Sequence, residues 1–487
     1  MKTENKGGMP ADVLQENTGA LQAEKKTDDW QEETIAAIAT AASPSGIGII
    51  RISGKEAVRI GDQVFHPARK GVSLAASKGY TVHYGHLYDG DRLIDEGIVL
   101  LMRAPHSYTA EDTVEIQCHG GILVMRRILE AVFRAGARPA EPGEFTKRAF
   151  LNGRLDLSQA EAVMDVIRSE NEYALKSSLE QLGGSLSSRI RNMRETLLYE
   201  IARIESALDD PEHHPLDGYA QKLDCILDPI VAELDRLISS SDEGRILMEG
   251  IRTVILGKPN AGKSSLMNVL LGEDRAIVTE IAGTTRDTLE ENLRLRGLSL
   301  RLIDTAGIRD TEDRVEQMGV ERARKIADSA DLILFVADGS RPLDENDRNI
   351  IRQMKDKRSI VLLNKTDLET VLTQEELARE TGQEVIAISA REETGIEKLE
   401  QRIEELFLGG DLTMNGEVMI TNARHKKALE EARESLLQVK QSIRDGMPED
   451  FYSIDLTDAY AHLGAILGEA LEDDVVEEIF SRFCTGK

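Results

Sequence analysis

One segment near the middle of the chain constrains the fold more than any other. Residues 257–264 read GKPNAGKS and fit the pattern G-x-x-x-x-G-K-[S/T] of a phosphate-binding loop. An apolar run at 253–256 precedes the segment, and a helical pattern at 265–270 follows it. This strand–loop–helix order lets backbone N–H groups and a helix N-terminus face phosphate oxygens. The sequence therefore predicts an α/β P-loop domain in which Lys263 neutralises phosphate charge and Ser264 binds Mg²⁺.

A second motif supports this prediction. Residues 304–307 read DTAG and follow an apolar strand pattern at 300–303. At this place Asp304 is suited to hold Mg²⁺, and the Gly307 amide is suited to sense the γ-phosphate.

A third motif identifies the base. Residues 364–367 read NKTD and follow the apolar run 360–363. The carboxylate of Asp367 can accept hydrogen bonds from N1–H and the 2-amino group of guanine, whereas adenine would leave it unpaired. Ser389 and Ala390 follow another strand pattern and fit the last base-contacting loop. The expected ligand is GTP and not ATP.

The composition bounds the class of protein. A chain of 487 residues is long enough for about three domains, because single cores rarely grow past about 250–300 residues. No apolar run approaches the ~20 residues of a membrane span, and residues 1–29 are polar and predicted to be a disordered extension. Cys118, Cys225 and Cys484 lie far apart, which indicates a reducing, cytoplasmic setting. The net charge of −27 argues against non-specific nucleic-acid binding, so any such contact needs a local basic patch or a partner.

The pattern of apolar residues divides the chain into parts. Residues 30–150 alternate strand-like runs with Gly and Pro and predict an α+β domain. Residues 151–248 are helical almost throughout, 249–409 form the predicted Ras-like α/β domain, and 410–487 are helical again. Because domain termini often lie close together, we expect the α/β domain to be inserted into one discontinuous helical domain. The predicted fold class is therefore multidomain.

The predicted hydrolysis site differs from that of Ras. The position after Gly307 is Ile308, which cannot orient the attacking water as the Ras glutamine does. Another polar group in residues 309–316 is expected to do so, and a second hydroxyl ligand for Mg²⁺ is expected in the loop 279–287.

Taken together, the motifs resemble those of the MnmE (TrmE) family, the GTPases of tRNA wobble-uridine modification. The resemblance covers residues 34–487 and includes the loop IAGTTRD and the ending FCTGK. The GTPase motifs are shared with other GTPases, whereas the ending Cys-x-Gly-Lys joined to this N-terminal domain is typical of this family. The N-terminal segments that carry the resemblance are 48–54, 115–121, 142–145 and 151–157.

The resemblance implies roles for residues around the nucleotide. Potassium would be bound by Asn260 and by the carbonyls of Thr279, Ile281 and Thr284, and Mg²⁺ by Ser264 and Thr285. Glu316 would place the attacking water, and Lys263 would act beside it in catalysis. The residues expected to contact GTP are Asn260, Ala261, Gly262, Lys263, Ser264, Ser265, Thr279, Glu280, Ile281, Ala282, Gly283, Thr284, Thr285, Asp304, Thr305, Ala306, Gly307, Asn364, Lys365, Asp367, Ser389, Ala390 and Arg391.

The resemblance also implies a folate site in the N-terminal domain. Its ligand would be 5-formyltetrahydrofolate or a related one-carbon tetrahydrofolate, contacted by Arg51, Glu115, Arg154 and Lys487. Cys484 would be a catalytic residue near that pocket; the alternative is a buried apolar cysteine at a helix end. Relatives usually have an apolar residue in place of Thr485, and some have Lys in place of Arg154.

The implied activity needs partners. The family works as a homodimer with a flavin-dependent partner of the GidA/MnmG type, in a heterotetramer or larger complex. It acts on tRNA to form a 5-carboxymethylaminomethyl- or aminomethyl-type group on uridine 34. No flavin or NAD fingerprint occurs in this chain, so the redox chemistry would come from the partner. The alternatives are a regulatory or ribosome-assembly GTPase without modification chemistry and, less favoured, a folate enzyme that GTP regulates.

Overall fold

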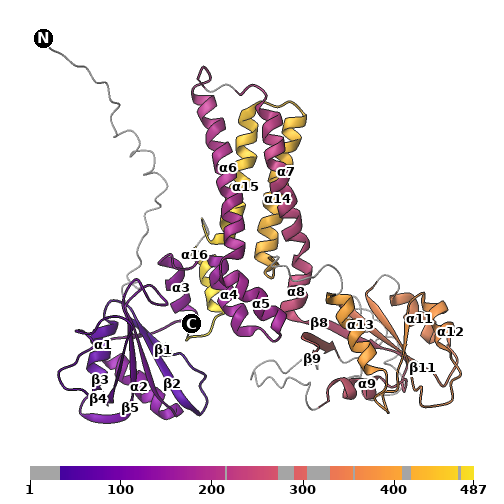
Figure 1. Ribbon diagram of the computed structural model, residues 1–487, viewed down its shortest axis with the longest axis horizontal. Helices are drawn as coiled ribbons and strands as arrows, with labels where there is room; N and C mark the ends of the chain where they lie inside the picture. The colour runs from indigo at the N-terminus through magenta and orange to yellow at the C-terminus, as the bar shows by residue number, and fades with distance from the viewer. Residues whose placement is uncertain are drawn as a thin grey trace. The chain divides into compact units, whose positions relative to one another are not determined.

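A computed structural model describes residues 33–213, 216–272, 290–303, 330–354, 357–408, 418–469 and 473–486 (Figure 1). The chain divides into two compact units. We call residues 1–155 together with 472–487 the N-terminal unit, and residues 156–471 the central unit. The end of the chain, predicted from its helical pattern as part of the helical domain, is thus grouped with the N-terminal unit.

A seven-stranded sheet forms the centre of the N-terminal unit, in the order β3-β4-β5-β6-β2-β1-β7. Its pairs are antiparallel except β1 with β7. Helices α1 and α2 pack on it around a core that includes Ile52, Ile116 and Ile128 (Figure 1). The strands are β1 (Ile35–Ile38), β2 (Ser45–Ser53), β3 (Phe65–Pro67), β4 (Thr81–Asp89), β5 (Arg92–Met102), β6 (Thr113–Gly120) and β7 (Arg138–Pro139), and the helices are α1 (Ala57–Val64), α2 (Ile122–Arg134), α3 (Glu144–Leu151) and α16 (Asp473–Ser481).

The C-terminal segment is fitted closely into the N-terminal unit. The ring of Phe480 in α16 lies 6.2 Å from that of Phe150 in α3 and 5.1 Å from that of Phe483. Gly143 has a φ of +71°, and a Cβ atom there would lie 2.5 Å from the carbonyl oxygen of Phe480. A Cβ on Gly486 would lie 2.7 Å from the Ile38 carbonyl oxygen, so both glycines permit close backbone contact.

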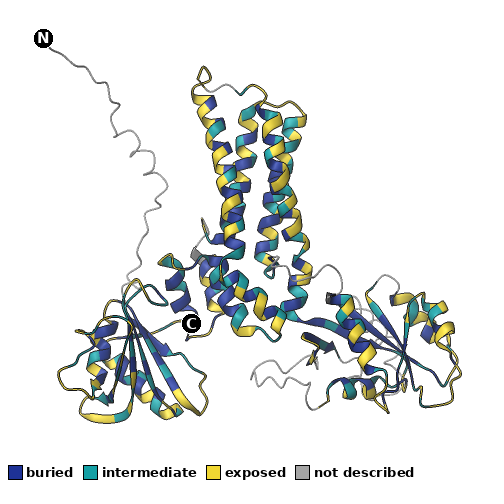
Figure 2. Cartoon of the chain, viewed as in Figure 1, coloured by how far each residue is buried: buried dark blue, intermediate teal, exposed yellow. Residues whose placement is uncertain are grey.

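Four long helices of the central unit enclose one apolar core. Buried apolar residues of α6 recur every three or four positions from Leu186 to Ile204 and face this core. The core draws on residues 186–237 and on residues 418–467, which come from both helical stretches of the sequence; Figure 2 shows the buried inner faces of these helices. The helices are α4 (Leu157–Arg168), α5 (Glu172–Leu182), α6 (Ser185–Asp209), α7 (Tyr219–Ser239), α8 (Ser241–Glu249), α14 (Ala423–Arg444) and α15 (Glu449–Leu467).

The α/β part of the central unit has a six-stranded sheet in the order β13-β12-β11-β8-β10-β9. All pairs are parallel except β9 with β10, and the central strands are almost wholly apolar because both faces are buried. The strands are β8 (Ile251–Leu256), β9 (Glu290–Leu295), β10 (Leu298–Ile303), β11 (Leu332–Asp338), β12 (Ser359–Asn364) and β13 (Val385–Ala387), and the helices are α9 (Lys263–Leu270), α11 (Glu345–Met354), α12 (Gln374–Thr381) and α13 (Ile396–Leu408).

The strand order indicates where this sheet would bind a ligand. The chain leaves β8 toward one edge and later returns to β11 on the other side of β8, so the strand order reverses beside β8. Open α/β sheets bind ligands at the carboxyl ends of the strands at such a point. The predicted multidomain architecture, with α+β, helical and P-loop α/β parts, is confirmed. Among the described residues, no helix is long and apolar enough to cross a membrane.

Candidate functional site

The phosphate-binding loop follows β8 and ends at the first residue of α9. Gly257 and Gly262 have φ values of +150° and +100°. A Cβ atom would lie 2.4 Å from the Val336 carbonyl oxygen at the first glycine, and 2.0 Å from Asn364 Nδ2 at the second. Both positions therefore require glycine, and the loop places the free N–H groups of the α9 N-terminus toward a bound anion.

The lysine of the motif lies over this loop. Lys263 Nζ donates to the carbonyl oxygens of Gly257 at 2.8 Å and of Lys258 at 2.7 Å. Ser264 and Ser265 are exposed in the first turn of α9, and Asn260 is exposed with a φ of +63°. An exposed hydroxyl and an exposed amide beside the loop are oxygen ligands of the kind that Mg²⁺ and K⁺ need.

The base-recognition motif is joined directly to the phosphate loop. Asn364, the last residue of β12, is 2% exposed. Its Nδ2 donates to the Ala261 carbonyl oxygen at 2.8 Å, and its Oδ1 accepts from the Ala390 N–H at 3.0 Å. One buried side chain thus links the three nucleotide-binding segments.

The carboxylate that the sequence predicts to recognise guanine is also oriented. Asp367 Oδ1 accepts from Ser389 Oγ at 2.7 Å, and Ser389 Oγ in turn accepts from the Glu392 N–H at 3.2 Å. One carboxylate oxygen is thereby held in place, which favours the edge-on pairing with guanine that the sequence predicts. Arg391 follows Ala390 and is exposed.

The remaining predicted nucleotide contacts lie outside the described residues. They are residues 279–285, residues 304–307 and Glu316.

Sequence reasoning missed two side-chain groups at this edge of the sheet. Lys365 Nζ donates to Asp338 Oδ2 at 2.6 Å, and Lys258 Nζ contacts two aspartates at the start of α11. Burial alone would raise the pKa of Asp338, but hydrogen bonds from Lys365 and Ser340 lower it below its usual range. The sequence does carry one signal for Asp338, since it is an acidic residue at the carboxyl end of an apolar strand pattern.

A second group of polar residues lies in the N-terminal unit. Arg51 in β2 and Glu115 in β6 are direct cross-strand partners, with Nε 2.8 Å from Oε1. Their side chains are 13% and 14% exposed. The Arg51 guanidinium lies 5.1 Å from the ring centre of Tyr108, and that of Arg154 lies 4.9 Å from the same ring. Three of the four predicted folate contacts are therefore close together, and Lys487 lies outside the described residues.

Tyr108 was not predicted, although it links the two arginines. Its hydroxyl is 2.9 Å from Thr146 Oγ1, which fixes the ring. The segment around it has no strand or helix pattern, so no sequence signal singles it out. An aromatic ring within cation–π distance of two guanidinium groups stabilises their positive charge.

The chain end approaches the same group. Arg51 Nη1 donates to the Gly486 carbonyl oxygen at 3.4 Å, and the Gly143 N–H donates to the Cys484 carbonyl oxygen at 3.2 Å. The Cys484 side chain is exposed, so its alternative interpretation as a buried apolar residue is wrong.

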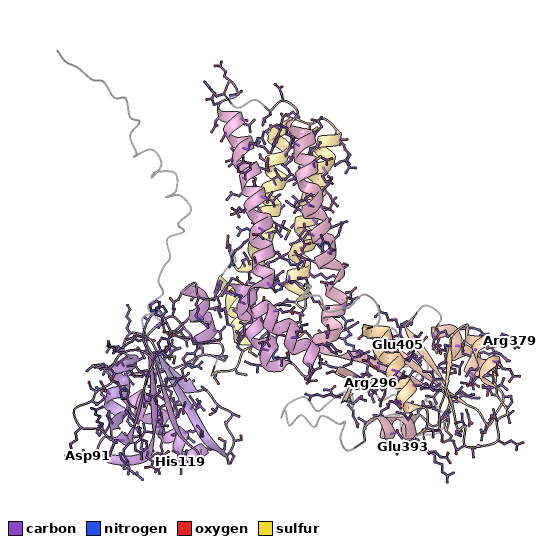
Figure 3. The ribbon with its side chains drawn as sticks, in the orientation of Figure 1. Asp91, His119, Arg296, Arg379, Glu393 and Glu405 are labelled. Atoms are coloured by element: carbon purple, nitrogen blue, oxygen red, sulfur yellow. The ribbon has the colours of Figure 1, made fainter. Side chains whose placement is uncertain are left out.

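His119 lies four residues beyond Glu115 along the chain, near the end of β6. Its ring Nδ1 is 2.8 Å from Asp95 Oδ1, and the side chain is 67% exposed (Figure 3). The hydrogen bond with Asp95 raises the pKa of His119. The exposure of His119 fits a surface ion pair.

Comparison with known proteins identifies the family of the chain. The MnmE helical domain model matches residues 157–484, and the model of the GTP-binding protein TrmE N-terminus matches residues 34–154. The protein named tRNA modification GTPase MnmE from Lachnoclostridium phytofermentans is 54% identical over 93% of this chain and 99% of its own length.

Other relatives carry the same name. Those from Lactobacillus helveticus and Clostridioides difficile are 45% and 44% identical, over 93% and 94% of this chain and 98% and 99% of their own lengths. A solved structure of Aquifex aeolicus Era bound to GDP and aluminium fluoride is 26% identical and covers 38% of this chain and 67% of its own, with a TM-score of only 0.27. From the two matching domain models and the near full-length relatives, we conclude that the chain belongs to the MnmE (TrmE) family of tRNA modification GTPases.

Proposed function

We propose that this protein hydrolyses GTP and couples hydrolysis to modification of the wobble uridine of certain tRNAs. The observation that carries the proposal is the Asn364 side chain, which joins a phosphate loop to a guanine-reading loop. The names of the relatives supply the coupled activity.

The ions proposed for hydrolysis have ligands within the phosphate loop. Ser264 would bind Mg²⁺ and Asn260 would bind K⁺, because both side chains are exposed beside the phosphate cradle. Bound there, the cations would neutralise charge that develops on the phosphates. Thr285 and the carbonyls of Thr279, Ile281 and Thr284 would complete their ligand sets. Glu316 would position water, since Ile308 cannot.

The proposed folate site rests on the Arg51–Glu115 pair. Glu115 would accept hydrogen bonds from the pterin of a reduced one-carbon folate, and Arg51 and Arg154 would face its acidic groups. Lys487 would contribute a further positive charge. Cys484 would take part in the modification step, which its exposure permits.

Two kinds of association are proposed. On one face of the N-terminal sheet, Tyr84 pairs with Ile98 and Val82 pairs with Leu100 across β4 and β5. Val82, Tyr84 and Ile98 are 62%, 53% and 39% exposed, and an apolar sheet face of this kind marks a protein interface. We assign it to a homodimer. A flavin-dependent partner of the GidA/MnmG type would bind this dimer and supply the redox chemistry.

The function is tested by mass spectrometry of tRNA nucleosides from a deletion strain. Loss of the modified wobble uridine, restored by the wild-type gene, is the expected result. If the deletion strain kept the modified wobble uridine at the level of the parent strain, the proposal would be contradicted. A regulatory or ribosome-assembly GTPase would then be favoured.

The ion requirement is tested separately. GTP hydrolysis in potassium is compared with hydrolysis in sodium at equal ionic strength, for wild type, Asn260→Ala and Glu316→Ala. Equal rates in the two salts would remove the potassium proposal. Full activity of Glu316→Ala would assign water positioning to another residue of the 309–314 segment.

A further inference from the structure

Three carboxylates lie between the end of β11 and the first turn of α11, outside every nucleotide motif of the chain. They are Asp338, Asp344 and Asp347, which we call the carboxylate bracket. Each of the two nucleotide-binding loops directs one lysine to this bracket: Lys258 from the phosphate loop and Lys365 from the base-recognition loop.

The phosphate-loop lysine is held by two carboxylates. Lys258 Nζ lies 2.9 Å from Asp344 Oδ2 and 2.7 Å from Asp347 Oδ2. The Asp347 side chain is only 4% exposed, so its charge requires a partner. The hydrogen bond with Lys258 is also the largest cause that lowers the pKa of Asp344.

The two carboxylates are themselves fixed by the start of α11. Asp344 Oδ1 accepts from the N–H groups of Asn346 and Asp347 at 2.9 and 3.2 Å. In return, Asp347 Oδ2 accepts from the Asp344 N–H at 3.1 Å. This reciprocal capping arrangement makes the anchor rigid, so Lys258 is positioned by a helix start and not by a flexible loop.

Fixing Lys258 fixes the residues on which catalysis depends. The Lys258 carbonyl oxygen accepts from Lys263 Nζ at 2.7 Å. Asn260 follows two residues later, in a left-handed conformation with a φ of +63°. Asn adopts this conformation more readily than most other residues, and the anchored loop around it favours that conformation here.

The base-recognition lysine has a separate anchor in the same bracket. Asp338 Oδ2 accepts from Lys365 Nζ at 2.6 Å, and Asp338 Oδ1 accepts from the Ser340 N–H at 3.0 Å and Oγ at 2.7 Å. The Asp338 side chain is 8% exposed. Lys365 has a φ of +66° and directly follows Asn364, so this contact bears on the guanine-reading loop.

We infer that the carboxylate bracket is a positioning device for both nucleotide-binding loops. Asp347 acts through Lys258 on the phosphate loop and on Asn260, and Asp338 acts through Lys365 on the base-recognition loop. Asp344 assists Asp347 and caps α11. The part of the inference that concerns Asn260 and potassium rests on the proposed function.

The decisive variant is Asp347→Asn in the full-length protein, because it keeps the side-chain shape and removes the charge. It is compared with Lys258→Met, Lys258→Arg and the double variant Lys258→Met/Asp347→Asn. Glu345→Gln is the matched control, since Glu345 lies in the same helical turn but is 64% exposed and pairs with Arg352. The measurements are the Kd of a fluorescent GDP analogue, the potassium concentration for half-maximal hydrolysis, and Tm.

Asp347→Asn and Lys258→Met are each expected to raise the Kd for the GDP analogue by about tenfold and to raise the half-maximal potassium concentration. The Kd of the double variant should not exceed that of the single variant with the larger effect, because both changes remove the same interaction. Lys258→Arg should retain most of the affinity, and Glu345→Gln should match wild type.

Three outcomes would overturn the inference. If Lys258→Met weakens nucleotide binding and Asp347→Asn does not, Lys258 acts on the nucleotide directly. If both variants lower Tm but leave Kd and potassium activation unchanged, the contact is only structural. If their effects simply add, the two residues act independently.

The second anchor is tested by Asp338→Asn. It should raise the Kd for the GDP analogue severalfold without changing the half-maximal potassium concentration, because Lys365 lies on the base side. If Asp338→Asn raised the half-maximal potassium concentration as much as Asp347→Asn does, the two anchors would not act on separate loops. If wild type hydrolyses GTP equally in potassium and sodium, the potassium proposal fails, whereas the Kd comparison still decides the role of the bracket.

Discussion

Asn364 and Ala261, which lie more than a hundred residues apart in the sequence, are joined by a 2.8 Å hydrogen bond from the buried side-chain amide to the loop carbonyl. The same side chain accepts from the Ala390 N–H. The phosphate loop and the two loops predicted to recognise the base are thus held together by one side chain.

Asn364→Ala should therefore destabilise the GTPase domain. The Ala261 carbonyl and the Ala390 N–H would each lose a buried partner, at a total cost of about 2–4 kcal/mol of unfolding free energy. Urea denaturation measures this change. Asn349→Ala, at an exposed position of α11, is the control and should be neutral. Equal stability of the two variants would show that the bridge contributes nothing.

Asp367→Asn should exchange the base specificity of the site. The variant loses the acceptor for the guanine amino group but can donate to the 2-keto group of xanthine. GTP binding should fall by at least about a hundredfold, and xanthosine triphosphate should recover it. Competition titrations with both nucleotides give the ratio. Unchanged GTP affinity would refute the assignment of Asp367.

Asp165 should make the helical domain less stable as the pH rises. Burial, aided by the nearby Glu161, raises the pKa of Asp165 from its ordinary value of 3.8 to about 6. The folded state then binds the proton more tightly, so stability is highest below about pH 4 and is lost as the pH rises toward 6. The shift corresponds to about 3 kcal/mol.

Asp165→Asn should remove that loss. Urea denaturation of wild type and variant between pH 4 and 7 tests this, since titration of groups distant from Asp165 cancels in the difference. The pKa of Glu161 is shifted in the opposite direction from that of Asp165. Although burial would raise its pKa, His425 and Arg424 lower it to about 2, so its contribution is lost only at more acidic pH. A pH-independent difference between wild type and Asp165→Asn would contradict the assignment.

The Arg51–Glu115 pair should control folate binding without affecting GTP hydrolysis. Arg51→Met and Glu115→Gln should each weaken 5-formyltetrahydrofolate by at least about tenfold, because each leaves a largely buried charge without its partner. Tyr108→Leu should have a smaller effect, through loss of the aromatic face between two guanidinium groups.

Calorimetry measures these affinities, and Arg126→Met is the control because its pair with Glu130 is exposed on α2. No heat of binding to wild type well above micromolar folate would disprove the site. Equal weakening by Arg126→Met would show that the effect is not local.

Cys484→Ser should abolish the modified nucleoside and leave GTP hydrolysis intact. The thiol is exposed, so serine can replace it without loss of packing. Nucleoside analysis of tRNA from a complemented strain gives the product, and phosphate release gives the hydrolysis rate. Simultaneous loss of both activities would make the cysteine structural.

The sequence predicted those parts of the site whose chemistry depends on local backbone. The glycines of the phosphate loop, the NKTD turn and the apolar strands before them each require a short, recognisable pattern, and the structure places them as expected. The bracket contacts of Lys258 and the position of Tyr108 between Arg51 and Arg154 could not be predicted, because they depend on how distant segments meet. For the same reason, the helical periodicity of α16 does not show that it packs against α3.

The closure of the N-terminal unit by α16 has a consequence for biosynthesis. Its sheet and first three helices emerge from the ribosome before the whole of the central unit, residues 156–471. The segment that brings Phe480 against Phe150 emerges after it. The sheet is thus translated before the central unit but completed only after it, and until then its surface for α16 is uncovered. Synthesis that stops within the central unit would leave Arg51 without its hydrogen bond to the Gly486 carbonyl, so a truncated product would lack one contact of the proposed folate site.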